Sequence, residues 1–344
     1  MKKARNFKAV MGTLLIGALL PCALLAQNEP TVLGGPSKTG TVGAQFLQIG
    51  VSARATGMGE SFVALVNDAS AAFYNPAALT EVGGREAMFN HTNLPGGLAH
   101  FYAAYVQPVS GFGTVAISFN MLTTGDMPIT VAFEGATGET FSASESAIAV
   151  SYAKQLTDRF SVGGTGKLIL EDLAGFDERT VAFDVGTLYH TGFRDLTIGM
   201  AVSNFGPDLN FGTEKDSGGN VIFEGQNFPL PITFKFGIAL DVVNRSTSKL
   251  ILASNLVQPN DNLRYETVGF EYSWQDALFL RGGFKIDEED DEDNAGDTNG
   301  FSERFSAGAG IKARLSDFTG KFDVSWVSQD NLDDLIRFSV LLNF

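Results

Sequence analysis

Large apolar residues alternate with small or polar ones along most of the chain from Glu86 to Phe344, in runs of roughly ten. In residues 232–241 every second residue is large and apolar, and those between them are Thr233, Lys235, Gly237, Ala239 and Asp241. A period of two predicts β-strands with two different faces. Apolar side chains on one face and small or polar ones on the other are typical of a membrane β-barrel, with lipid outside and a packed or wet lumen inside.

About fourteen such runs can be counted, which predicts an all-β fold: a transmembrane antiparallel β-barrel of about fourteen strands. The runs lie near residues 86–91, 98–107, 112–121, 144–155, 160–170, 178–189, 195–204, 230–241, 249–257, 264–273, 277–286, 303–313, 319–328 and 335–344.

The connections between these runs fall into two length classes. If both chain ends are periplasmic, the long connections 122–143, 205–229 and 287–302 all follow outward-going strands. The short connections 156–159, 190–194, 274–276 and 314–318 all follow returning strands. Outer-membrane barrels have short periplasmic turns and longer extracellular loops, whereas a secreted β-sandwich has no reason to sort its loops in this way.

The first 26 residues are predicted to be a secretory signal peptide. Lys2, Lys3, Arg5 and Lys8 precede an apolar stretch at 9–20, and cleavage is expected after Ala26. The chain's single cysteine, Cys22, lies in this segment, and Pro21 before it does not suit a lipidation site. The mature chain is therefore expected to contain no disulfide and no sulfur-ligated metal. Residues 27–41 are polar, with Pro and Gly, and are interpreted as a periplasmic lead-in.

Residues 42–85 differ from the rest because neither a period of 2 nor one of 3.6 runs through them. They are rich in Gly and Ala and are predicted to be a plug inside the barrel formed by 86–344. Arg54 and Asp68 are the natural ion pair of such a plug, because an unpaired charge in a lumen is costly. Asn75 precedes Pro76, which pushes its backbone out of the helical region and ends a local segment.

Composition argues against several functions. Asp and Glu outnumber Lys and Arg by 39 to 24, which gives a charge of -15 and disfavours nucleic-acid binding. The histidines are interpreted as loop or interface residues, because their spacing matches no zinc site: His91, His100 and His190. No Ser/His/Asp arrangement stands out, so no catalytic residue, metal or cofactor is predicted and an enzyme is not favoured.

The acidic run 287–297 does not fit a calcium-binding EF-hand, because that register places Ala295 and Ser302 at ligand positions. A solvated, self-repelling surface loop explains it better, although weak divalent-ion binding stays open. Its first residues form a candidate partner-binding loop: Asp287, Glu288, Glu289, Asp290 and Asp291.

The chain ends in a strand whose apolar face includes Phe338, Val340, Leu342 and Phe344. This ending resembles the C-terminal signal by which the barrel insertion machinery recognises bacterial outer-membrane proteins.

Residues 52–79, SARATGMGESFVALVNDASAAFYNPAAL, closely resemble the N-terminal segment of the PorV/PorQ family of outer-membrane proteins. The matching positions are Ala53, Arg54, Gly57, Met58, Gly59, Asp68, Ala69, Asn75, Pro76 and Ala77. The chain departs from the best-known members at Val51-Ser52, where they have Pro-Asp, and at Tyr74, where they have Trp. That family is related in fold to the FadL-type transporters of hydrophobic compounds.

The resemblance implies a role in type IX secretion, in which PorV-type proteins associate with a very large outer-membrane translocon and receive cargo by its C-terminal signal domain. The departures leave room for a divergent member with another partner. The first hypothesis is thus an interaction protein that binds translocon or cargo, embedded in outer-membrane lipid. The alternative is a FadL-like passive transporter of hydrophobic small molecules, although acidic outer loops suit greasy solutes poorly.

Overall fold

The computed structural model describes residues 40–344 except 132–134, 174–175, 213, 216–220, 224, 288–302, 316–317 and 330–332. The expected signal peptide at 1–26 and nearly all of the expected lead-in at 27–41 lie outside the described residues, so both stay predictions.

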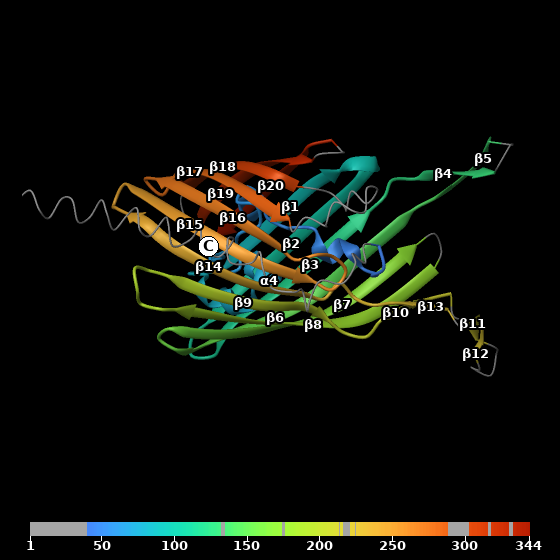
Figure 1. Ribbon diagram of the computed structural model, residues 1–344, viewed down its shortest axis with the longest axis horizontal. Coiled ribbons are helices and arrows are strands. Elements are labelled where there is room, and N and C mark those ends of the chain that lie inside the picture. Colours follow the sequence, from blue (N-terminus) through green and yellow to red (C-terminus); the bar gives the residue numbers. More distant parts are fainter. Residues whose placement is uncertain are drawn as a thin grey trace, which may run out of the picture. The chain divides into compact units, whose positions relative to one another are not determined.

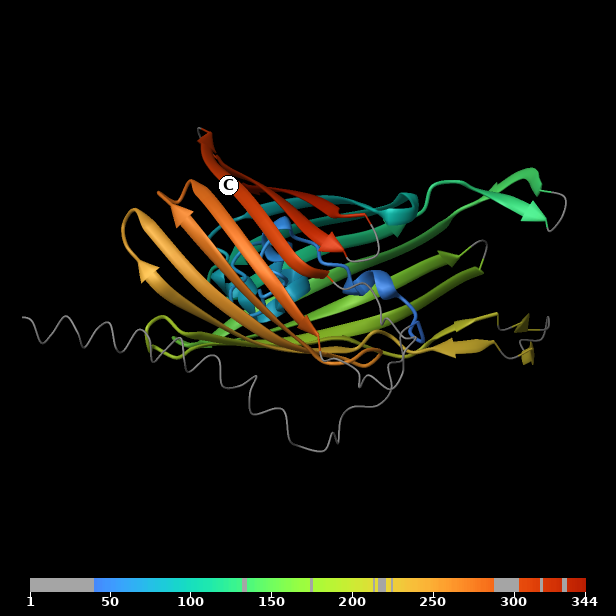
Figure 2. The same ribbon diagram turned by 45° about the horizontal axis from the view of Figure 1, so that its top comes forward.

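Fourteen strands form a closed antiparallel barrel in which β1 pairs with β20 (Figures 1 and 2). Each of the fourteen runs expected from the sequence corresponds to one barrel strand, so the predicted antiparallel β-barrel of about fourteen strands is confirmed. The barrel strands are β1 (Glu86–Leu94), β2 (Leu98–Val109), β3 (Gly113–Thr123), β6 (Ala143–Thr157), β7 (Phe160–Leu173), β8 (Phe176–His190), β9 (Thr197–Phe205), β14 (Thr233–Asn244), β15 (Ser248–Pro259), β16 (Tyr265–Trp274), β17 (Leu278–Asp287), β18 (Glu303–Leu315), β19 (Phe318–Gln329) and β20 (Leu335–Asn343).

The alternating pattern of the sequence becomes the two faces of the barrel wall. In β3 the side chains of Ile117 and Phe119 are exposed on the outer surface, whereas Thr114, Ser118 and Asn120 are buried inside. In β20, Ile336, Phe338 and Val340 are exposed, and Arg337 and Ser339 are buried between them. A water-soluble protein would not expose so many large apolar residues, but a lipid-facing wall requires them.

Within the described residues, the connections after β3 and β9 contain strands that the alternation did not predict. The connection after β3 holds β4 (Met127–Val131) paired with β5 (Gly135–Phe141). The connection after β9 holds two pairs, β10 (Leu209–Phe211) with β13 (Gln226–Phe228), and β11 (Glu214–Lys215) with β12 (Val221–Phe223). The end of the barrel that carries the long connections is called the outer end here, and the opposite end the inner end.

Before β1 the described chain forms only short helical turns, as the absence of a sustained period predicted. They are η2 (Gln45–Gln48), α3 (Ala53–Thr56), α4 (Ala71–Tyr74) and η3 (Pro76–Glu81), and η4 (Pro95–Gly97) links β1 to β2. Asn75 caps η3, since its side chain accepts a hydrogen bond from the backbone N–H of Ala77, and Pro76 takes the first helical position. No helix in the described part of the chain is both long and apolar enough to cross a membrane.

Candidate functional site

The N-terminal segment (42–85) lies along the inner face of the barrel from one end to the other. At the outer end the N–H of Gly43 donates to the carbonyl of Pro229, and Gln48 donates to Asp261 in the β15–β16 connection. At the inner end Glu81 lies 3.1 Å from the ring of His190, where β8 ends. The segment therefore spans the interior lengthwise before the chain enters β1.

On much of the barrel wall, this segment lies in close contact with inward-facing glycines. A side chain at Gly283 or Gly269 would overlap the backbone of Met58, and one at Gly199 would overlap Val63. Among the described residues, the inward glycines of the barrel strands that contact the segment are Gly163, Gly186, Gly199, Gly237, Gly269, Gly283 and Gly308, on seven different strands. Glycine is required where one backbone approaches another this closely. The inner wall is thus shaped to the path of residues 57–77.

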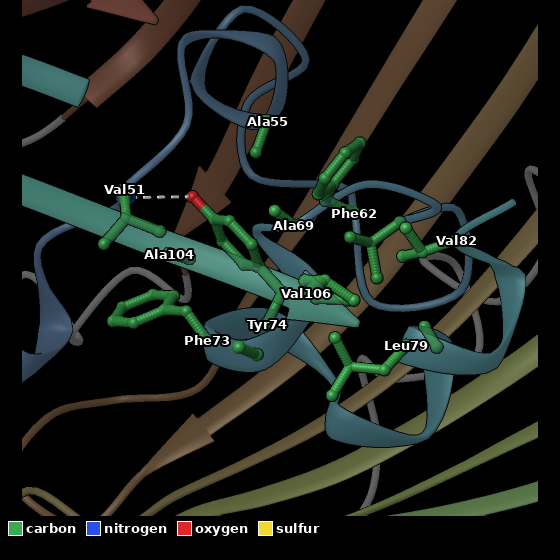
Figure 3. Close-up of a cluster of buried hydrophobic side chains, with 14 of the residues drawn as sticks. Val51, Ala55, Phe62, Ala69, Phe73, Tyr74, Leu79, Val82, Ala104 and Val106 are labelled. Atoms are coloured by element: carbon green, nitrogen blue, oxygen red, sulfur yellow. Dashed lines mark hydrogen bonds between the residues drawn. The ribbon is translucent and has the colours of Figure 1, made fainter. Parts of the chain in front are cut away.

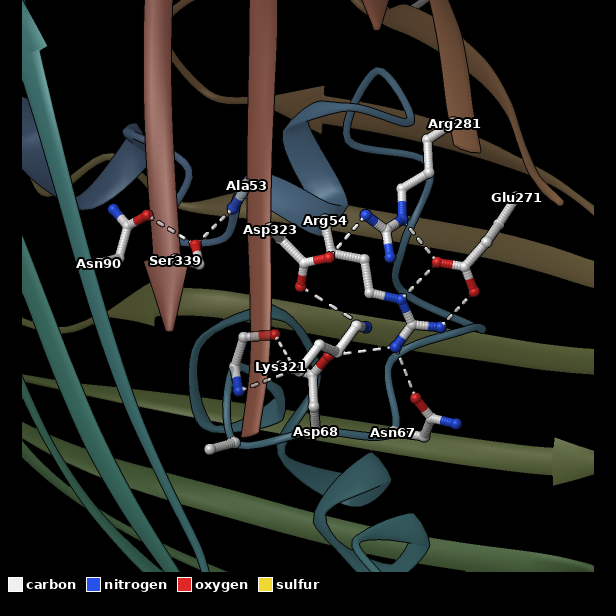
Figure 4. Close-up of polar contacts among 12 residues, drawn as sticks. Ala53, Arg54, Asn67, Asp68, Asn90, Glu271, Arg281, Lys321, Asp323 and Ser339 are labelled. Carbon is white, nitrogen blue, oxygen red and sulfur yellow. Dashed lines mark hydrogen bonds and ion pairs between the residues drawn. The ribbon is translucent and has the colours of Figure 1, made fainter. Parts of the chain in front are cut away.

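Arg54 is the centre of the polar contacts between segment and wall (Figure 4). Its guanidinium donates two hydrogen bonds of 2.8 Å to the two carboxylate oxygens of Glu271 on β16. It also donates to Asn67 at 2.6 Å and to Asp68 at 3.1 Å, within the segment itself. The Arg54–Asp68 pair expected from the sequence is present. However, Glu271, which the sequence analysis did not identify, makes the larger bidentate contact.

The charges around Arg54 balance across three strands. Arg281 on β17 donates to Glu271 at 2.6 Å and to Asp323 on β19 at 2.7 Å, and Lys321 lies 3.5 Å from Asp323. Three cations therefore face three carboxylates. Burial by itself would lower the pKa of the Arg54 guanidinium, but Glu271 and Asp68 raise it above its ordinary value, so Arg54 stays charged. Because buried charges are tolerated only when paired, each partner is needed by the others.

The last strand ties the segment to the closing seam of the barrel. Ser339 on β20 accepts a hydrogen bond from the backbone N–H of Ala53 at 2.8 Å and donates to Asn90 on β1 at 2.9 Å (Figure 4). Arg337 similarly donates to Thr92 on β1 and to Thr56 in the segment. Ser339 and Arg337 therefore stabilise both the β1–β20 pairing and the packing of α3 against β20.

Aromatic side chains of the segment belong to a buried cluster that also includes residues of the barrel wall (Figure 3). Tyr74 accepts a hydrogen bond from the N–H of Val51, and its ring packs edge-on against Phe62 and Phe73. The guanidinium of Arg54 lies 5.1 Å from the centre of the Phe62 ring. These side chains are buried against Ala104 and Val106 of β2.

Asn75 fastens the other half of the segment. Its amide donates to the carbonyl of Val63 at 3.0 Å and to that of Thr187 on β8 at 3.1 Å. Its side-chain oxygen caps η3, so one residue satisfies three backbone groups.

The remaining predicted site residues fall into separate regions. Gly57, Met58 and Gly59 lie in the segment against Gly308, Gly269 and Gly283. The C-terminal side chains Phe338, Val340 and Phe344 are exposed on the outer surface, and Leu342 is half-buried. Asp287 ends β17, and Glu288, Glu289, Asp290 and Asp291 lie outside the described residues. The candidate partner-binding loop therefore stays a prediction.

One histidine was misjudged from the sequence. His100 is not a loop or interface residue, because it lies on the inner face of β2 with no exposed surface. Its position in an alternating run was the available signal, since residues at this parity point inward. Within the described residues no three His, Cys, Asp or Glu side chains are grouped to hold a metal ion.

The fold and this interior define an outer-membrane β-barrel whose lumen contains the segment that precedes its first strand. A family model described as type IX secretion system protein PorV matches residues 35–262, more than half of the chain. The chain belongs to the PorV family, and its location is the outer membrane. No curated protein matches it.

Solved structures of similar fold are FadL-like outer-membrane channels. The CymD monoaromatic hydrocarbon channel is 12% identical, with a TM-score of 0.55 over 86% of this chain and 98% of that one. The Pseudomonas putida toluene transporter TodX is 11% identical (TM-score 0.55, 85% and 97% covered), and a Pseudomonas aeruginosa FadL homologue 12% (TM-score 0.54, 86% and 98% covered). At such low identity the likeness shows the fold alone.

Proposed function

We propose that this protein is a non-enzymatic component of type IX secretion that binds the translocon or the C-terminal signal domain of its cargo. Binding takes place at the outer end of the barrel, while the N-terminal segment stays in the lumen as a plug. Membership of the PorV family supports the secretion role, and the family implies association with that system rather than a specific partner.

The observation that carries the proposal is the fit between the segment and the wall. Glycines on seven strands contact the segment, six of them at its backbone, and Arg54 is held by Glu271 in a buried, charge-balanced network. Moving the segment aside would expose these charges to the lumen and remove the contacts between the segment and the inward-facing glycines. A protein built in this way presents its connections to partners more readily than it passes material through its centre.

The alternative is passive transport of hydrophobic small molecules, which is favoured by the FadL-like fold. The hydrocarbon channels named above share this architecture. The charged side chains in the lumen argue against it. A hydrophobic solute would have to pass Arg54, Glu271, Arg281 and Asp323. Burying such charges against an apolar ligand is costly.

The test is to purify the tagged protein from native outer membranes in mild detergent and to identify what accompanies it. An unrelated tagged barrel from the same membranes serves as the control. Enrichment of a very large outer-membrane translocon, or of exported proteins that share one C-terminal domain, is expected. Recovery of a barrel with only lipid or hydrophobic ligand would overturn the secretion role and favour the transporter.

A further inference from the structure

Three glutamates form a row on the inner face of the barrel at its outer end. Glu171 on β7 lies directly opposite Glu145 on β6 and directly opposite Glu178 on β8. Directly opposite residues on one face of a sheet have Cβ atoms about 4.5–5.5 Å apart, and like charges in such pairs destabilise the sheet. An arrangement of this kind needs something that compensates the charge.

No described cation provides this compensation. Glu145, Glu171 and Glu178 form no ion pair within the described residues, in contrast to Asp184 and Glu271, which are paired with Lys167 and Arg54. The backbone at Phe46 and Ala44 lies close to Glu145 and Glu171. A neutral backbone supplies no counter-charge, so the two carboxylates face each other uncompensated.

A second observation is independent of the register and concerns individual atoms. Only 3% of the surface of Glu171 is exposed, and its Oε1 is buried without a hydrogen-bond partner. Oε2 of Glu145 is buried without a partner as well. Burying a carboxylate oxygen that accepts no hydrogen bond costs free energy. Two such oxygens at neighbouring positions are available to coordinate a cation.

We infer that Glu145 and Glu171 bind a divalent metal ion, with Ca²⁺ as the matching species, at the outer end of the lumen. Ca²⁺ takes carboxylate and water oxygens in flexible geometry, so two glutamates and several waters suffice. Extracellular sites of this kind bind Ca²⁺ with Kd values of about 10⁻⁴–10⁻³ M. The ion would join β6 and β7 beside the backbone of Ala44 and Phe46.

The experiment measures Ca²⁺ binding to the full-length protein in detergent by calorimetry. The wild type is expected to bind one Ca²⁺ per chain at this site with millimolar or tighter affinity, and Glu171→Gln and Glu145→Gln to weaken binding at least tenfold. Heat-modified electrophoretic mobility establishes that each variant is folded. Glu139→Gln, in the exposed strand β5, is the matched control that keeps binding.

Two further outcomes decide between explanations. The acidic run 287–297 is a competing source of Ca²⁺ binding, so Asp290→Asn with Asp291→Asn is measured in parallel and is expected to leave the affinity unchanged. If these substitutions remove binding and Glu171→Gln does not, the inference is overturned. Absence of Ca²⁺ binding by the wild type at 5 mM, a few times the weakest expected Kd of about 10⁻³ M, would also overturn it. That result would indicate that Glu145 and Glu171 share a proton instead of binding a metal ion.

Discussion

The guanidinium of Arg54 and the carboxylate of Glu271 form two hydrogen bonds of 2.8 Å, although 217 positions separate the two residues in the chain. One belongs to the N-terminal segment and the other to β16. This bidentate pair fixes α3 to the barrel wall.

Replacement of Arg54 by Met is expected to destabilise the folded barrel by about 3–5 kcal/mol, because it leaves buried carboxylates without their cation. Arg54→Lys restores the charge but not the two parallel bonds, so it is expected to recover the stability only partly. Denaturant unfolding in detergent measures both. Lys249→Met, which removes a half-exposed pair with Asp241, is the control and should cost no more than about 1 kcal/mol. Equal effects of Arg54→Met and Lys249→Met would contradict the central role of Arg54.

The close contacts between the segment and inward-facing glycines predict different effects for two Gly→Ala substitutions. Gly283→Ala places a methyl group against the backbone of Met58 and Gly59, and a displacement costing about 1–3 kcal/mol is expected. Gly166→Ala on β7 meets only the ring of Phe183, at 3.8 Å, and should be neutral or slightly stabilising. Protease sensitivity of the segment, measured with unfolding, shows whether residues 57–59 have moved. An undisturbed segment in Gly283→Ala would show that the close fit is not required.

Asn75→Ala is expected to destabilise the protein by about 1–3 kcal/mol for each buried backbone group that loses its partner. These groups are the carbonyls of Val63 and Thr187 and the N–H of Ala77. Hydrogen exchange is expected to increase at η3 before it increases in the strands. Asn244→Ala is the control, since that side chain is exposed and makes a single 3.5 Å contact with Asp241. Unchanged exchange at η3 would refute a clamping role for Asn75.

Lys167 and Asp184 stabilise an irregularity in the barrel wall. Their charged groups lie 2.7 Å apart and are buried, and Asp184 also accepts from the backbone N–H of Asn204, which has a φ of +63°. The β8–β9 register shifts at this point. Lys167→Met should cost about 3–5 kcal/mol because the buried carboxylate of Asp184 loses its counterion. Adding Asp184→Asn should recover much of the loss, and a double variant no more stable than Lys167→Met would contradict the pairing.

The strand pattern could be predicted from sequence because lipid outside and a filled lumen inside impose opposite demands on alternate residues. The Arg54–Asp68 pair was accessible as well, because the two charges stand out in one apolar segment. Glu271, Arg281 and Asp323 were not paired with Arg54, since that pairing depends on which strands lie beside α3. A signal for their burial existed: each is a charge at an inward position of an alternating run, such as Glu271 between Phe270 and Tyr272.

The strands within the long connections escaped detection for a different reason. β4 and β5 are mostly exposed on both faces, so no alternation between apolar and polar residues marks them. The contacts between wall glycines and the segment could not be predicted either. A glycine within a strand indicates that another chain segment approaches closely, but it does not identify that segment.

The most direct test of the account fixes the N-terminal segment to the barrel and asks whether partners still bind. Ser61 and Thr267 are buried with their hydroxyl oxygens 2.8 Å apart, so Ser61→Cys with Thr267→Cys places two thiols within disulfide reach. The chain's only native cysteine is Cys22, in the expected signal peptide. The measurement is the amount of translocon recovered with the tagged variant from native membranes, oxidised and reduced. Equal recovery in both states is predicted, because the segment stays in place while the outer end binds. Recovery only after reduction would contradict the account, since it would show that the segment has to move.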